Sequence, residues 1–107
     1  MADAEREIRA ARNESLFRSL NEQLDAVRAG VRRAEYFCEC ARPTCAATIL
    51  LLVEEYEHVR QDGDRFVVLP EHVDRDIERV LEEHGTYWIV EKIGVGRDVA
   101  DALDPRA

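Results

Sequence analysis

Three cysteines within eight residues constrain the fold of this 107-residue chain more than any other feature of its sequence. Cys38, Cys40 and Cys45 form a C-x-C-x4-C cluster, and the chain has no other cysteine. Residues i and i+2 of a strand point to the same side, so a strand through Cys38 and Cys40 presents two sulfurs together. A turn at Pro43 can bring Cys45 back toward them. The spacing therefore predicts a hairpin that gathers three thiols.

We expect these thiols to bind Zn²⁺. Structural zinc takes four tetrahedral thiolate or imidazole ligands, and Cys3His is an ordinary set. An odd number of cysteines does not complete a disulfide framework, and iron–sulfur clusters generally use four cysteines. Reduced reactive thiols without a metal, or cysteines that are simply buried, are the alternative interpretations of the cluster.

The predicted fourth ligand is His72. It follows a predicted strand at residues 66–69 and stands beside the rigid corner at Pro70. If that strand lies near the cysteine hairpin, the imidazole of His72 can reach the metal. His84 and His58 are the alternative histidines, and a carboxylate or a water is a further alternative for the fourth position.

The N-terminal segment is predicted to be one long helix. Residues 3–29 contain no proline or glycine and are dominated by good helix formers, and Gly30 stands where a helix ends. Its apolar residues have a heptad-like spacing: Phe17, Leu20, Leu24, Val27 and Val31. Such a stripe either packs on the body of the protein or pairs with a second copy of the chain. Residues 1–33 are therefore a candidate dimerisation arm.

Residues 34–107 are predicted to form a small zinc-stapled domain of the α+β class. The expected strands are 35–40, 46–52, 65–69 and 86–93, and the expected short helices are 54–61, 74–83 and 98–103. These elements give a roughly four-stranded antiparallel or mixed sheet with helices on one face. A bound metal often supplies the stability that a domain of this size lacks.

The charge balance bears on the partners. Fifteen basic and 23 acidic side chains give a net charge of -8, which argues against nucleic acid or an anionic membrane as a partner. The longest apolar run, 46–53, is far too short to span a bilayer, and the start of the chain has no basic and apolar secretory signal. We therefore expect a cytoplasmic protein that binds another protein, or a second copy of itself, through the N-terminal helix.

Several motifs together resemble a family of small actinobacterial proteins. They are Asn13-Glu-Ser-Leu-Phe-Arg18, Phe37-Cys-Glu-Cys40 with Cys45, Arg65-Phe-Val-Val68 with Pro70 and His72, His84-Gly85 and Val90-Glu-Lys92. The resemblance extends from about residue 12 to 106, and the C-x-C-x4-C cluster is its most distinctive part. That family carries no established activity. The resemblance implies a stand-alone small protein with a metal-binding cysteine cluster, and it places His72 inside a shared segment.

The function predicted from these features is that of a small, non-enzymatic zinc module that interacts with or regulates a partner. A thiol-based redox or metal-responsive switch is the alternative, because thiolates released from zinc can be oxidised. A zinc hydrolase is a third interpretation. It would need an open fourth position at the metal and an acid such as Glu39 or Glu71 beside it.

Overall fold

The computed structural model describes residues 3–28 and 30–106. Its elements are α1 (Ala4–Ala26), β1 (Arg33–Phe37), β2 (Thr48–Leu52), α2 (Val53–Val59), β3 (Arg65–Val68), β4 (Glu78–Glu83), β5 (Trp88–Lys92) and α3 (Val95–Ala102). An antiparallel hairpin joins β1 to β2, and a second antiparallel sheet has the order β3-β5-β4. The α+β class and the long N-terminal helix are confirmed, and the strands are divided between two small sheets.

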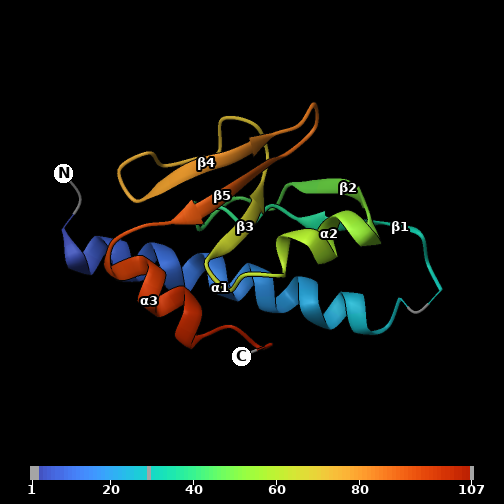
Figure 1. Ribbon diagram of the computed structural model, residues 1–107, viewed down its shortest axis with the longest axis horizontal. Coiled ribbons are helices and arrows are strands. Elements are labelled where there is room, and N and C mark those ends of the chain that lie inside the picture. Colours follow the sequence, from blue (N-terminus) through green and yellow to red (C-terminus); the bar gives the residue numbers. More distant parts are fainter. Residues whose placement is uncertain (1–2, 29, 107) are drawn as a thin grey trace.

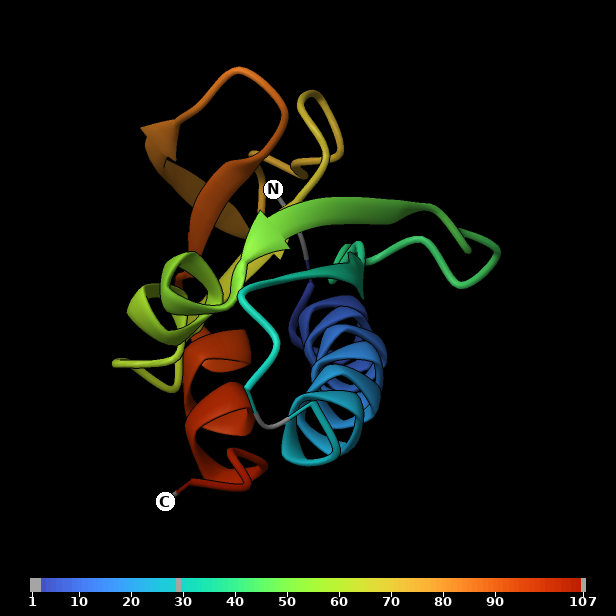
Figure 2. The ribbon, with the colours of Figure 1, turned by 90° about the vertical axis from the view of Figure 1, so that its right-hand side faces the viewer.

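Helix α1 runs along the longest dimension of the molecule, which is 42 Å, and both sheets lie on one side of it (Figure 1). The side chain of Asp3 caps its first turn by accepting a hydrogen bond of 2.7 Å from the N–H of Arg6. Helix α3 packs beside α1 under the sheets (Figure 2). The division of the chain at residue 33 stays a prediction. Among the described residues, no helix is both long enough and apolar enough to cross a membrane.

The hydrophobic core lies where the hairpin, the second sheet and α2 meet. Alternate residues of β1 and β2 face inward, and Tyr36 stands opposite Ile49 in their register. The ring of Tyr36 stacks on Tyr56 of α2 with centroids 4.3 Å apart. Strand β3 contributes three consecutive buried residues because it is covered on both faces. This core fixes the ends of β1, β2 and β3 relative to one another.

The predicted helix at 74–83 is wrong, because this segment is a loop that leads into strand β4. Ile77, Val80 and Leu81 have helical spacing, yet only Ile77 is fully buried. Val80 pairs with Val90 of β5, and Leu81 stands exposed at an irregularity in the register. Pairing with the buried strand β5 overrides the helical pattern of this segment.

Helix α1 turns a polar face toward the protein. Its buried residues have the spacing of one helical face, and they are Ala11, Glu14, Ser15, Arg18 and Asn21. Of the predicted apolar stripe, Phe17 is half-buried against Phe37, whereas Leu20, Val27 and Val31 are exposed. The interpretation in which the stripe packs on the protein's own body is therefore wrong for these three residues. Pairing with a second copy stays a prediction.

Candidate metal centre

Four side chains with metal-binding atoms converge from three segments of the chain. Cys38 and Cys40 follow β1, Cys45 precedes β2, and His72 follows β3. One ligand atom from each residue is available, and these four atoms all lie within 4.8 Å of one another. The structure thus brings together all four residues that the sequence analysis selected. Their role as metal ligands stays a prediction.

The distances within this cluster suit a tetrahedral ion. Nδ1 of His72 lies 3.7 Å from Sγ of Cys38 and 3.7 Å from Sγ of Cys45. For zinc bonds of about 2.3 Å to sulfur and about 2.1 Å to nitrogen, the sulfur–nitrogen edge of a tetrahedron is about 3.6 Å. The two distances from His72 therefore match those of a Cys3His set with Nδ1 as the histidine donor.

A tight turn after β3 directs His72 toward the cysteines. The N–H of His72 donates to the carbonyl oxygen of Leu69 at 3.0 Å, with Pro70 and Glu71 between them. Glu71 has a φ of 71°, so the turn has the pattern of type II, whose third position favours glycine. The guanidinium of Arg42 donates to the carbonyl oxygen of Glu71 at 3.5 Å. The strained turn is thus connected to the cysteine loop that faces it.

The segment that carries the first two cysteines connects the two sheets. The N–H of Cys38 donates to the carbonyl oxygen of Ala47 at 2.9 Å and so extends the hairpin. The next N–H, of Glu39, donates to the carbonyl oxygen of Val67 in β3 at 2.8 Å. The N–H of Leu69 points at Sγ of Cys38, 3.2 Å away. Backbone donors of this kind stabilise metal-bound thiolates.

The neighbouring thiols of Cys38 and Cys40 shift each other's pKa in opposite directions. The thiol of Cys38 lowers the pKa of Cys40 to about 5, although burial opposes this shift. Hydrogen bonds from neighbouring backbone, His72 and Cys45 lower the pKa of Cys40 further. The pKa of Cys38 is raised, first by its interaction with the thiol of Cys40 and then by burial. The cluster therefore favours one thiolate, the form of cysteine that binds metal, at Cys40.

Glu39 points away from the thiols into the protein and is fully buried. Its carboxylate accepts hydrogen bonds from the N–H of Val67 at 3.0 Å, from Nδ2 of Asn21 at 2.9 Å and from the hydroxyl of Tyr56 at 2.7 Å. Burial raises the pKa of Glu39, and these hydrogen bonds oppose that shift. The sequence analysis offered Glu39 as the acid of a zinc enzyme, whereas its carboxylate is bound by three structural donors.

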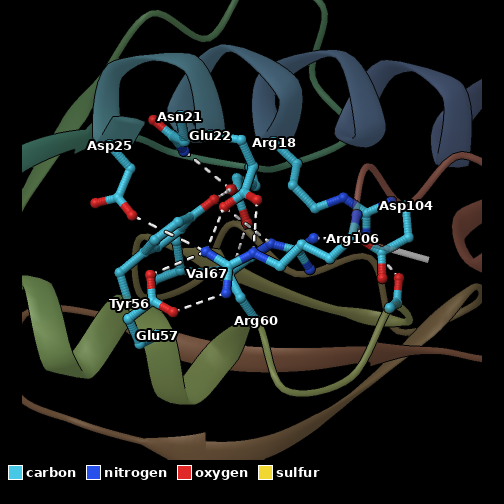
Figure 3. A network of polar contacts seen from close by, with 12 residues as sticks. Arg18, Asn21, Glu22, Asp25, Tyr56, Glu57, Arg60, Val67, Asp104 and Arg106 are labelled. Carbon is cyan, nitrogen blue, oxygen red and sulfur yellow. Dashed lines mark hydrogen bonds and ion pairs between the residues drawn. The ribbon is translucent and has the colours of Figure 1, made fainter. Parts of the chain in front are cut away.

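An ionic network surrounds the donors of Glu39 and anchors the C-terminal segment (Figure 3). Arg106 reaches Glu22 of α1 at 2.6 Å and Glu57 of α2 at 2.7 Å. The fully buried guanidinium of Arg60 pairs with Asp104 and lies 3.4 Å from Glu22. Sequence reasoning missed this network, because its members read as ordinary surface charges. These ion pairs connect α1, α2 and the C-terminal segment to one another, next to the residues that donate to Glu39.

The other two histidines lie outside the cysteine cluster. Nε2 of His58 lies 2.9 Å from Glu82, and Nε2 of His84 lies 2.8 Å from the second oxygen of the same carboxylate. Both histidines are exposed. Only His72 joins the cysteines in the part of the chain that the structure describes.

Comparison with protein-family models, curated proteins and solved structures finds no match to this chain. The resemblance to the small actinobacterial family therefore rests on its motifs alone. No activity or ligand comes to this chain from a relative, so its function has to be argued from the geometry of the cluster.

Proposed function

We propose that the protein is a small zinc-binding interaction or regulatory module with a structural site at Cys38, Cys40, Cys45 and His72. The observation that carries this proposal is the convergence of four ligand atoms within 4.8 Å from three separate segments. Thiolate and imidazole donors together suit zinc better than the hard cations magnesium or calcium. Four protein ligands complete a tetrahedral shell, which is typical of a structural site and leaves no position for a substrate.

Bound zinc would cross-link the hairpin to the end of β3 and so add to the free energy of folding. Three thiolates and a neutral imidazole leave the site with a net charge of -1. The N–H of Leu69, 3.2 Å from Sγ of Cys38, is placed to offset part of that charge. The role of this chain's residues is to hold the four donors in place.

The test is the metal content of protein purified under reducing conditions without added metal. We expect roughly one zinc per chain by elemental mass spectrometry. Cys45→Ala should remove the zinc and lower the melting temperature, and His72→Ala should weaken zinc retention. His84→Ala, which changes an exposed histidine outside the cluster, is the matched control and should keep the zinc. Well-folded wild-type protein without metal, or zinc retained by both cluster variants, would overturn the proposal.

A redox switch at the same cysteines is the second candidate. The close approach of three sulfurs favours it, and Cys45 is only half-buried. One thiolate would attack a peroxide oxygen and release hydroxide, which gives a sulfenic acid. A second thiolate would then displace hydroxide from that sulfur, so the disulfide forms as peroxide is reduced and the zinc leaves. Zinc release by peroxide, reversed by a dithiol and free zinc, would favour the switch over the purely structural site.

A further inference from the structure

A broad groove borders the candidate metal centre. It has a volume of about 1120 Å³ and lies between the N-terminal half of α1, the cysteine loop and the connection from β3 to β4. Five arginines line it, and they are Arg6, Arg9, Arg12, Arg42 and Arg75. Its acidic lining residues are Asp74 and Asp76. The groove thus concentrates positive charge in a chain whose net charge is -8.

Carboxylates of the same chain neutralise two of these arginines. The guanidinium of Arg6 is bound by Asp74, and Arg9 lies 3.2 Å from Glu5 one helical turn away. These pairs offset the charge of two of the five arginines. The remaining three arginines therefore decide which ligand the groove attracts.

Arg12, Arg42 and Arg75 are exposed and have no acidic side chain as partner within residues 3–28 and 30–106. Arg42 donates to a backbone carbonyl at 3.5 Å, and Arg75 lies over the ring of Trp88 at 5.9 Å. They come from three different segments of the chain and line the same groove. Arginines in such an arrangement suit carboxylate or phosphate groups, which they bind through paired hydrogen bonds.

Apolar side chains line the groove between the arginines. Leu16 of α1 has 60% of its surface exposed, and Pro43 and Val73 belong to the opposite wall. Pockets for small molecules have volumes of about 300 to 1,000 Å³, and this open groove is larger. From Arg6 to Leu16 the helix rises about 15 Å, which matches about five residues of extended chain. The size and lining therefore fit a short peptide that carries both acidic and apolar side chains.

A polynucleotide fits these observations less well than a peptide does. Nucleic-acid binding generally uses a continuous basic face, because the phosphates continue along the strand. Here five of the 15 basic side chains line one groove, and the chain as a whole carries 23 acidic side chains. A short acidic segment can use the groove without passing over the remaining acidic surface.

We propose that this groove binds an acidic, partly apolar peptide segment of a partner protein. The carboxylates of the segment pair with Arg12, Arg42 and Arg75, and its apolar side chains contact Leu16 and Val73. The lining of the groove indicates the chemistry of the partner, whereas the metal cluster alone gives no such indication. It does not require zinc to be the bound metal.

The test uses the full chain, as purified, and a fluorescein-labelled peptide of about six residues in which glutamate alternates with leucine. Fluorescence anisotropy should report binding that weakens as salt is added, since exposed charges are screened. The Arg12→Glu/Arg75→Glu variant should weaken binding about tenfold or more, because two favourable charge contacts become repulsive. The same peptide with glutamine in place of glutamate should bind at least about tenfold more weakly than the parent.

The matched control is Arg32→Glu/Arg33→Glu, which changes the net charge equally at two exposed arginines outside the groove. It should stay within about twofold of wild type, since charges beyond the Debye length are screened. Equal loss in both double variants, equal binding of both peptides, or tighter binding of a single-stranded oligonucleotide would overturn the proposal. Zinc content, measured on every variant, separates a failed groove from a failed metal site. If Arg12→Glu/Arg75→Glu does not fold, Arg12→Gln/Arg75→Gln takes its place under the same criteria.

Discussion

Glu39, between two of the predicted metal ligands, is the residue that connects the cysteine hairpin to three other elements. Its carboxylate accepts hydrogen bonds from Asn21 of α1, Tyr56 of α2 and the backbone of Val67 in β3. Because neighbouring residues of an extended chain point to opposite sides, a side chain so fixed also fixes the direction of the thiols on either side. The position of the sulfurs thus depends on a residue outside the predicted ligand set.

Glu39→Gln is expected to lower the free energy of unfolding by about 2 to 3 kcal/mol, because an amide nitrogen would then face hydrogen-bond donors inside the protein. Tyr56→Phe removes one of these donors and should cost about 1 kcal/mol. Urea denaturation of the purified proteins measures both changes. A Glu39→Gln protein as stable as wild type would show that the three hydrogen bonds contribute little.

The sequence analysis selected the four clustered residues but did not predict that Glu39 and its hydrogen-bond donors hold the cysteine segment in place. The cysteines could be selected because their spacing is local and their chemistry is rare, and His72 because it follows a strand and a proline. Asn21 and Tyr56 are 18 and 17 residues from Glu39 in the chain, and no local pattern connects them. A glutamate in a polar loop reads as surface charge, and only the packing of three elements makes it a buried acceptor.

At the scale of elements, helix α1 is held to the body through charged groups as well as apolar ones. Nζ of Lys92 in β5 lies 2.7 Å from Glu14 of α1 and 3.6 Å from Glu78 of β4, and all three side chains are fully buried. One ammonium group thus faces two carboxylates in a site without solvent. Burial, and next the charge of Glu78, raise the pKa of Glu14 well above its ordinary value of 4.5.

This shift makes stability depend on pH in a definite direction. The folded protein holds the proton of Glu14 more tightly than the unfolded chain does, so the contribution of Glu14 to stability falls as pH rises above about 4.5. Glu14→Gln removes that loss and should become more stable relative to wild type between about pH 4.5 and 7. Glu5→Gln, at an exposed position of the same helix, is the control. A constant difference between Glu14→Gln and wild type across this range, measured by urea denaturation, would refute the assignment.

The outward face of α1 gives a second prediction at this scale. Leu20 and Val27 are 37% and 80% exposed and belong to the heptad-like stripe. Burial of such a stripe against the same stripe of a second copy would remove apolar surface from water, and we expect a dimer in solution. Light scattering after gel filtration should show a mass that Leu20→Glu/Val27→Glu reduces to that of the monomer. Leu103→Glu, at an exposed leucine off the stripe, should leave the mass unchanged; a wild-type monomer at every concentration excludes the dimer.

The sequence predicted the existence of α1 much better than its orientation. Helix formers without proline or glycine define a long helix whatever it packs against. The face of α1 that packs on the protein contains Glu14, Arg18 and Asn21. A search for regularly spaced apolar residues does not detect this face. Arg18 is buried because its guanidinium donates to two carbonyl oxygens and stacks on Phe66 at 4.6 Å. The hydrogen-bond partners of such a buried polar side chain lie far away in the sequence. A pattern of apolar residues therefore cannot predict its burial.

At the scale of the whole molecule, two small sheets meet, and the two-stranded one needs the other for its stability. A two-stranded hairpin is marginal in water without further packing, and the second sheet has only three strands. The cysteine segment lies at their junction, since Cys38 bonds to Ala47 of the hairpin loop and Glu39 bonds to Val67 of β3. A metal held by Cys38, Cys40, Cys45 and His72 would close this junction from its outer side.

Removal of zinc should therefore act first on this junction. We expect a chelator, under reducing conditions, to lower the melting temperature by about 10 °C or more, since structural zinc contributes several kcal/mol to folding. Hydrogen exchange should increase first in residues 38–47 and 69–73, whose order depends on the metal cross-link. Exchange in α1 and α3 should change less, because these helices pack on each other and do not depend on the metal cross-link for their backbone hydrogen bonds.

Cys45→Ala provides the control for this experiment, because a chelator should shift neither its melting temperature nor its exchange pattern further. Exchange that increases evenly over the whole chain would mean that zinc supports global folding and not the junction of the two sheets. Exchange that stays unchanged at residues 38–47 would mean that Glu39 and the core hold the hairpin without metal. The cluster would then be free to bind and release zinc in the folded protein, which is the behaviour that the redox switch requires and the structural site does not.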